Sequence, residues 1–185
     1  MSVTTTRTVL PTGTWTVDPA HSNVEFSAKH LGIATVRGAF NEFEGGVEVG
    51  EDGSARARGT VKAASIDTNE DQRDTHLRSE DFFHAEVHPE LSFESTEIRP
   101  LDEHAFLIHG ELTMRGVTRP VVLEAELQGT EIDPWGNERV GLEARGQVNR
   151  RDWNMTFNQA LGSGNMLVSD KIKLSLDISA IKQEQ

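Results

Sequence analysis

Hydrophobic and polar residues alternate along several stretches of the chain. From Ala55 to Ala63, small apolar residues occupy the odd positions and charged or polar residues occupy the even ones, with Val61 the largest of the apolar set. A period of two residues is typical of a β-strand with one face toward solvent and the other toward the interior. Because a solid core would use leucine or phenylalanine at the inward positions, this strand predicts a wall around a space.

The same alternation predicts further strands at residues 15–17, 24–28, 35–40, 43–49, 91–98, 106–114, 119–127, 139–149 and 171–180. Half-solvated strands of this kind are typical of antiparallel sheets, whereas parallel sheets covered by helices show continuous apolar runs. Residues 67–79 differ, because Asp67 or Thr68 can cap a helix there and Arg78 suits its last turn. The predicted fold is all-β, with one short helical insertion.

Two all-β architectures fit such a pattern, a sandwich of two sheets and a closed barrel. The small inward residues are Ala55, Ala57, Gly59 and Ala63 on one strand and Ala144 and Gly146 on another. A barrel of eight strands has room for side chains or for one small ligand. These small residues favour a lipocalin-like antiparallel β-barrel of about eight strands that encloses a ligand.

Length and composition limit the classes of protein to which the chain can belong. A length of 185 residues suits one domain, which we expect at 13–182 after a flexible N-terminal segment at 1–12. The absence of cysteine excludes disulfides, thiolate metal ligands and cysteine nucleophiles. The net charge of -12 disfavours nucleic acid as a partner. Residues 1–11 contain no apolar run typical of a signal sequence or membrane span, so we expect a cytoplasmic protein without stable membrane insertion.

Several motifs together resemble the YceI family of lipid and polyisoprenoid-binding proteins. They lie at His21–Phe26, Lys29–Gly32, Gly38–Phe40, Phe43–Gly45, Ser65–Thr68, Arg73–Phe83, His88–Pro89, Phe93–Thr96, Gly110–Pro120 and Asn149–Trp153. The resemblance implies a lipocalin-like barrel whose long apolar channel holds an isoprenoid or related lipid tail, commonly in a homodimer. Many relatives carry a secretion signal, and this chain departs from them in that respect.

The phenylalanines can line such a channel or fill a core, and their coexistence with small inward residues favours the channel. Phe82 and Phe83 follow the predicted helix and are candidates for a lid. Arg73, His76 and Arg78 are candidates for contacting a polar or anionic head group, although the two arginines also suit ordinary ion pairs on a helix surface. The candidate ligand-binding residues are Phe26, His30, Phe40, Phe43, Val61, Ala63, Arg73, His76, Arg78, Phe82, Phe83, Phe93, Phe106, Ile108, Leu112, Met114, Leu123 and Leu142.

Motifs for metal binding and catalysis are weak. His84 and His88 lack the zincin spacing, Pro89 biases His88 away from a helix, and on a strand the two histidines would lie roughly 13 Å apart. Ser163 lacks the two-residue glycine spacing of a nucleophile elbow. We therefore expect no catalytic residue, no metal and no cofactor.

The leading hypothesis is a non-enzymatic barrel that binds, stores or transports a long apolar lipid, such as a polyisoprenoid or isoprenoid quinone. Burial of five isoprene units at ~0.8 kcal/mol for each CH₂ already reaches the ~20 kcal/mol ceiling of non-covalent affinity. Burial alone therefore cannot set selectivity, and we expect a promiscuous carrier. The alternative is an acidic protein-interaction or stress-response module whose cavity is incidental.

Overall fold

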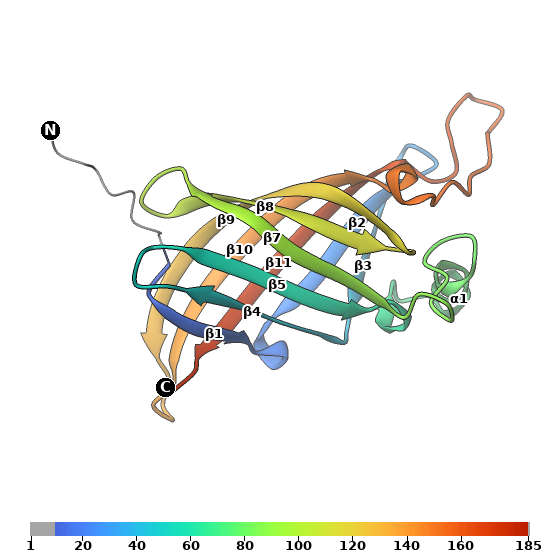
Figure 1. The fold of residues 1–185 in the computed structure, drawn as a ribbon. Helices are drawn as coiled ribbons and strands as arrows, with labels where there is room; N and C mark the ends of the chain where they lie inside the picture. Colours follow the sequence, from blue (N-terminus) through green and yellow to red (C-terminus); the bar gives the residue numbers. More distant parts are fainter. Residues whose placement is uncertain (1–9, 185) are drawn as a thin grey trace, which may run out of the picture.

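A single antiparallel sheet closes on itself in the computed structural model, which describes residues 10–184 (Figure 1). Its strands are β1 (Gly13–Val17), β2 (Asn23–His30), β3 (Ala34–Phe40), β4 (Phe43–Val49), β5 (Ala55–Lys62), β6 (Ile66–Asp67), β7 (Glu90–Pro100), β8 (Ala105–Met114), β9 (Val117–Ile132), β10 (Glu138–Asn149) and β11 (Lys171–Lys182). Its helices are α1 (Asp71–Arg78) and three short 3₁₀ helices, η1 (Pro19–His21), η2 (Ala63–Ser65) and η3 (Arg150–Trp153).

Bends divide some of the strands without breaking the barrel. The segments β1 and β2, separated by η1, both pair with β11: Val17 lies opposite Ala180, and Asn23 lies opposite Asp177. In the same way β4 pairs with β5 while β3, just before β4, pairs with β6. When each bent pair is counted once, the sheet is a closed antiparallel barrel of eight strands. The barrel prediction is confirmed.

The predicted strands all appear, with differences in extent. β9 runs from Val117 to Ile132, well beyond the predicted 119–127, and β6 is too short to show any periodicity. The helix is shorter than predicted because Glu70 is its N-cap, with a carboxylate that accepts from the N–H groups of Gln72 and Arg73. The prediction that Asp67 or Thr68 caps the helix is therefore wrong.

Thr68 has a different role, which explains the error. Its N–H and hydroxyl donate to Oδ1 of Asp74, at 2.8 and 2.5 Å. Both residues are buried. The contact fastens the chain before the helix to the helix itself, so a polar residue that suits a cap instead satisfies a buried carboxylate.

The two ends of the barrel differ (Figure 1). The end that carries α1, here the α1 end, also holds the β2–β3 and β8–β9 turns, η3 and the long segment between η3 and β11. The opposite end, here the closed end, is filled by buried side chains, namely Leu10, Trp15, Val49, Val140 and Ala180. Leu10 and Pro11 belong to the segment at 1–12 expected to be flexible. Leu10 is buried, and the carbonyl of Pro11 accepts a hydrogen bond from the Trp15 indole at 3.0 Å. Residues 1–9 of that segment lie outside the described residues.

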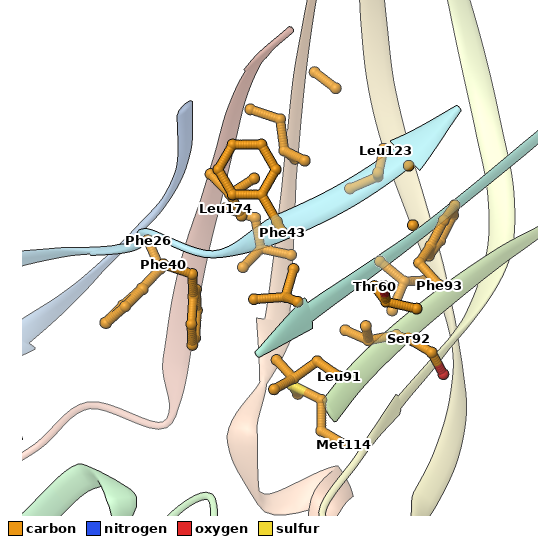
Figure 2. A pocket seen from close by; sticks show the side chains of 18 of the residues that line it. Phe26, Phe40, Phe43, Thr60, Leu91, Ser92, Phe93, Met114, Leu123 and Leu174 are labelled. Atoms are coloured by element: carbon orange, nitrogen blue, oxygen red, sulfur yellow. The ribbon is translucent and has the colours of Figure 1, made fainter. Parts of the chain in front are cut away.

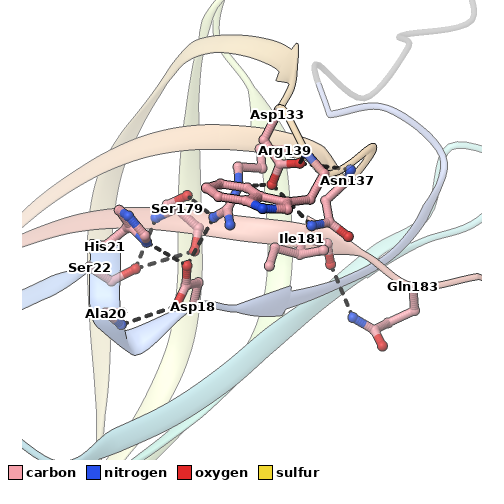
Figure 3. Close-up of polar contacts among 11 residues, drawn as sticks. Asp18, Ala20, His21, Ser22, Asp133, Asn137, Arg139, Ser179, Ile181 and Gln183 are labelled. Atoms are coloured by element: carbon pink, nitrogen blue, oxygen red, sulfur yellow. Dashed lines mark hydrogen bonds and ion pairs between the residues drawn. The ribbon is translucent and has the colours of Figure 1, made fainter.

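A polar network joins chain segments at the closed end of the barrel (Figure 3). Arg139 donates from Nε to Oδ2 of Asp133 at 2.8 Å and from Nη1 to Oδ2 of Asp18 at 2.9 Å. The same Asp18 oxygen lies 2.6 Å from Nδ1 of His21. Because Asp133 belongs to the β9–β10 turn and Asp18 precedes η1, Arg139 ties two turns to β10.

The network shifts the acidity of both carboxyls. Burial raises the pKa of Asp133, but hydrogen bonds from Arg139 and Asn137 outweigh it and hold that pKa well below its usual range. The hydrogen bond from Arg139 is the main cause that lowers the pKa of Asp18. Carboxyls with a lowered pKa in the folded state stabilise it fully above their unfolded pKa of about 4, and this contribution is lost as the pH falls through the folded value.

Replacement of Arg139 by methionine removes the largest of the contributions that lower the two pKa values. We expect the variant to be less stable than the wild type at pH 7, and its unfolding free energy to fall less between about pH 5 and pH 2. Urea unfolding midpoints measured across this range check the expectation. Arg99→Met is the matched control, because the Arg99–Glu97 pair is more than half exposed. A wild-type pH dependence in Arg139→Met would contradict this account.

Candidate functional site

The barrel encloses a cavity of about 310 Å³ whose wall is almost wholly apolar (Figure 2). This volume lies at the lower end of the ~300–1,000 Å³ range of ligand pockets. Residues from every strand except β6, and from the α1 end, contribute to the wall. The interior is hollow, as the small inward residues predicted.

The small residues contribute unequally to this space. Ala57 and Gly59 of β5 and Ala144 of β10 line the cavity. Gly146 does not, because Leu123 already occupies its place: a Cβ on Gly146 would lie 2.6 Å from a methyl carbon of Leu123. The chain turns into η2 after Lys62, so Ala63 is fully buried outside the cavity wall.

Two phenylalanine rings pack closely against glycines of the neighbouring strands. Phe26 of β2 covers Gly38 of β3, and Phe93 of β7 covers Gly110 of β8, so a Cβ on either glycine would collide with the ring. The missing side chains therefore let both rings lie close to the wall. This arrangement keeps the centre of the barrel open (Figure 2).

Aromatic residues continue from the wall into two segments at the α1 end, residues 79–88 and 154–169, here the lid. Phe40 lies between Phe26 and Phe83, with ring centroids 5.6 Å from each. Phe82 is buried and packs against Phe157 with centroids 5.5 Å apart. Phe82 and Phe83 both line the cavity, together with Leu77 and Met155.

The polar residues predicted to meet a head group have partners within the protein. Arg73 donates to the hydroxyl and the carbonyl oxygen of Thr68, both at 2.7 Å. Arg78 donates to the carbonyl of Ala64 at 3.0 Å, and His76 lies 2.8 Å from Oδ2 of Asp81. None of the three lines the cavity.

The other predicted ligand-binding residues fall into two groups, one outside the cavity wall and one within it. His30, which forms an isolated bridge with Val168 at the α1 end, and Ala63 lie outside the cavity wall. The wall contains Phe26, Phe40, Phe43, Val61, Phe82, Phe83, Phe93, Phe106, Ile108, Leu112, Met114, Leu123 and Leu142. That these side chains contact a ligand stays a prediction.

Inward residues of β11 and one charged residue also border the cavity and were not among the predicted site residues. Ile172, Leu174, Leu176 and Ile178 line the cavity, and their strict alternation could have identified them. Arg150 in η3 also borders the cavity although its side chain is only 4% exposed. Burial lowers the pKa of this arginine, while Asp170 opposes the shift. A lone charge after a strand leaves no periodic signal that could have revealed it.

The histidine pair has a different geometry from the predicted one. His84 and His88 lie in a turn with a positive φ of 51° at His84, and their ring centroids are 5.8 Å apart. The predicted separation along a strand is therefore wrong. Within residues 10–184, no group of three or more His, Cys, Asp or Glu residues is placed to hold a metal. No helix in the same part of the chain is long and apolar enough to cross a membrane.

An eight-stranded antiparallel barrel around an apolar cavity defines a lipocalin-like barrel protein. The YceI-like domain matches residues 15–180. The chain therefore belongs to the YceI family.

Two curated relatives illustrate the match. UPF0312 protein plu2095 of Photorhabdus laumondii is 39% identical over 166 residues, which cover 89% of this chain and 83% of the relative. UPF0312 protein PC1_2518 of Pectobacterium carotovorum is 37% identical over the same shares of the two chains.

Solved structures share the fold. The YceI protein of Campylobacter jejuni is 29% identical, with a TM-score of 0.73 over 84% of this chain and 90% of that protein. Burkholderia cenocepacia BcnA has a TM-score of 0.76 at 20% identity, over 88% and 98% of the two chains. A polyisoprenoid-binding domain from Saccharophagus degradans has a TM-score of 0.69 at 13% identity, over 91% and 98%. The last two likenesses show the fold alone.

Arg115 holds the lid segments together and offers a test of the lid. From the β8–β9 turn it donates to the carbonyl of Glu80 at 2.8 Å and to that of Asn154 at 2.9 Å. Arg115→Asn keeps a residue that tolerates the left-handed backbone at this position, where φ is 52°. We expect amide hydrogen exchange in residues 79–88 and 154–169 to accelerate about ten-fold, with little change in the strands.

Arg119→Asn is the matched control, because the exposed Arg119 donates only to the carbonyl of its neighbour Thr118. Unchanged exchange in both segments of the Arg115 variant would show that the lid does not depend on this arginine.

Proposed function

We propose that this protein is a non-enzymatic carrier that stores or transports a long apolar lipid, such as a polyisoprenoid or isoprenoid quinone, with the tail inside the barrel. The observation that carries the proposal is the hollow apolar interior of about 310 Å³ between the lid and the filled closed end. Cavities lined by apolar side chains stay dry and take up apolar molecules.

The composition of the wall supports binding rather than catalysis. Charged residues that border the cavity are Glu25, Glu44 and Arg58, all exposed, and the buried Arg150. An acid–base pair needs two titratable groups held within reach of one substrate atom. A hydrocarbon tail needs only apolar surface, worth about 25 cal/mol for each Å² removed from water.

The comparisons motivate the ligand class. The structural neighbour from Saccharophagus degradans is described as a polyisoprenoid-binding domain, and a tail of that kind suits an apolar cavity. The homodimer implied by the resemblance to the YceI family is part of the proposal, and light scattering of the purified protein tests it.

An interaction module remains the second candidate, because one patch of the surface favours it. Trp135 is 82% exposed and Ile132 is 66% exposed, both at the β9–β10 turn. Exposed aromatic residues are enriched in protein interfaces. In this candidate the turn binds a partner and the cavity has no ligand.

The carrier function is tested by filling the cavity. Ala144 is buried and lines the cavity, so Ala144→Phe places a ring in the space. We expect the wild type to yield a lipid on organic extraction and to bind a fluorescent farnesyl probe, and Ala144→Phe to lose at least about ten-fold in affinity.

Gln147→Phe, which adds the same ring at an exposed position of the same strand, is the matched control and keeps wild-type binding. If wild-type protein yields no lipid and fails to bind the probe, the interaction module replaces the carrier. Equal binding by Ala144→Phe and the wild type would place the probe outside the barrel.

A further inference from the structure

Arg150 is a buried cation at the α1 end of a cavity whose wall is almost wholly apolar. Its side chain is 4% exposed and it borders the cavity together with Met155 and Val168. Both of these residues also accept hydrogen bonds from its guanidinium through their backbone carbonyls. The guanidinium therefore lies where the segment after η3 meets the cavity wall.

The protein satisfies only part of this guanidinium. Nε donates to the carbonyl of Ser169 at 3.0 Å, Nη1 to that of Met155 at 2.6 Å, and Nη2 to that of Val168 at 3.4 Å. A guanidinium has five N–H groups. Among residues 10–184, neither Nη1 nor Nη2 has a hydrogen-bond acceptor for its second N–H.

The nearby carboxylate forms an ion pair with the guanidinium but no hydrogen bond to it. Asp170 places Oδ1 3.4 Å from Nη2 of Arg150, yet this buried oxygen makes no hydrogen bond within the described chain. A buried cation is stable only when it is paired and hydrogen-bonded, because its desolvation is costly. Arg150 therefore has charged N–H groups without acceptors at the edge of the cavity.

Three other arginines near the lid do not reach the cavity. Arg73, Arg78 and Arg115 donate to backbone oxygens and do not border the cavity. An anionic head group that enters with a hydrocarbon tail thus meets one buried cation, Arg150. A carboxylate accepts charge-assisted hydrogen bonds, which are about twice as strong as neutral ones.

We propose that Arg150 is the head-group site of the cavity and selects apolar chains that end in a carboxylate, with the chain running from Arg150 toward the closed end. The inference rests on the carrier function proposed above and adds the chemical class of its ligand. It also assigns the ligand a direction, with the head at the α1 end.

Competition against the fluorescent apolar probe N-phenyl-1-naphthylamine tests the selectivity. We expect palmitate to bind the wild type about ten-fold or more tightly than 1-hexadecanol, which has the same chain length. Arg150→Gln reduces the preference to about three-fold or less. Arg151→Gln, at the exposed neighbouring arginine, keeps the wild-type preference.

A measurement on the wild type covers the case in which Arg150→Gln does not fold. Carbon-13 NMR of bound [1-¹³C]palmitate reports the ionisation of its carboxyl as the pH changes. Contact with Arg150 lowers the pKa of this carboxyl below that of an unperturbed carboxylic acid, whereas an apolar site without a cation raises it.

The outcomes separate the two proposals. Equal affinity for palmitate and hexadecanol in the wild type, or a raised pKa of the bound carboxyl, overturns the role of Arg150 and leaves the carrier function intact. If neither ligand displaces the probe and the purified protein contains no lipid, the carrier function itself fails.

Discussion

The hollow interior depends on the size of the side chains that face the barrel axis. Several of them are too small to fill the space that eight strands enclose. Eight strands enclose a space that large side chains can fill completely. Here Ala57, Gly59 and Ala144 face that space, and the rings of Phe26 and Phe93 lie back against glycines. The backbone ladder closes the wall regardless of what lies inside, so the interior stays hollow while the fold is maintained by hydrogen bonds and by the core at the closed end.

Polar contacts at the α1 end complement this apolar wall. Arg78, Arg115 and Arg150 donate mainly to backbone carbonyls of segments that have few strand partners of their own. Guanidinium groups suit this task because one side chain can reach several carbonyls at once. The lid is therefore held by side chains rather than by the β-ladder, and it can differ in stability from the barrel beneath it.

Much of the fold could be predicted because alternation reports directly on which face of a strand is buried. The run from Lys171 to Ala180 shows this most clearly, since its even-numbered residues line the cavity or the closed end. Helix boundaries were less predictable, because Thr68 is a preferred N-cap residue and Glu70 is not. In the structure the buried Asp74 engages Thr68, and Glu70 caps the helix. The two-residue strand β6 carries no pattern at all.

The candidate site was predictable in its apolar part and not in its polar part. Phenylalanines and small residues on alternating strands pointed to the cavity wall. The destination of a long charged side chain depends on which backbone oxygens the tertiary fold brings near it. Arg73 and Arg78 accordingly donate to the chain before the helix, at Thr68 and Ala64. Arg150 lies at the cavity without any local signal.

The central claim is that the barrel is an apolar container for a hydrocarbon chain. A crystal structure of the protein as purified, without added ligand, tests it most directly. The account predicts elongated electron density that runs inside the barrel between Ala57 and Leu174. A barrel interior closed by inward-turned side chains, or filled by a hydrogen-bonded chain of ordered water, would contradict it.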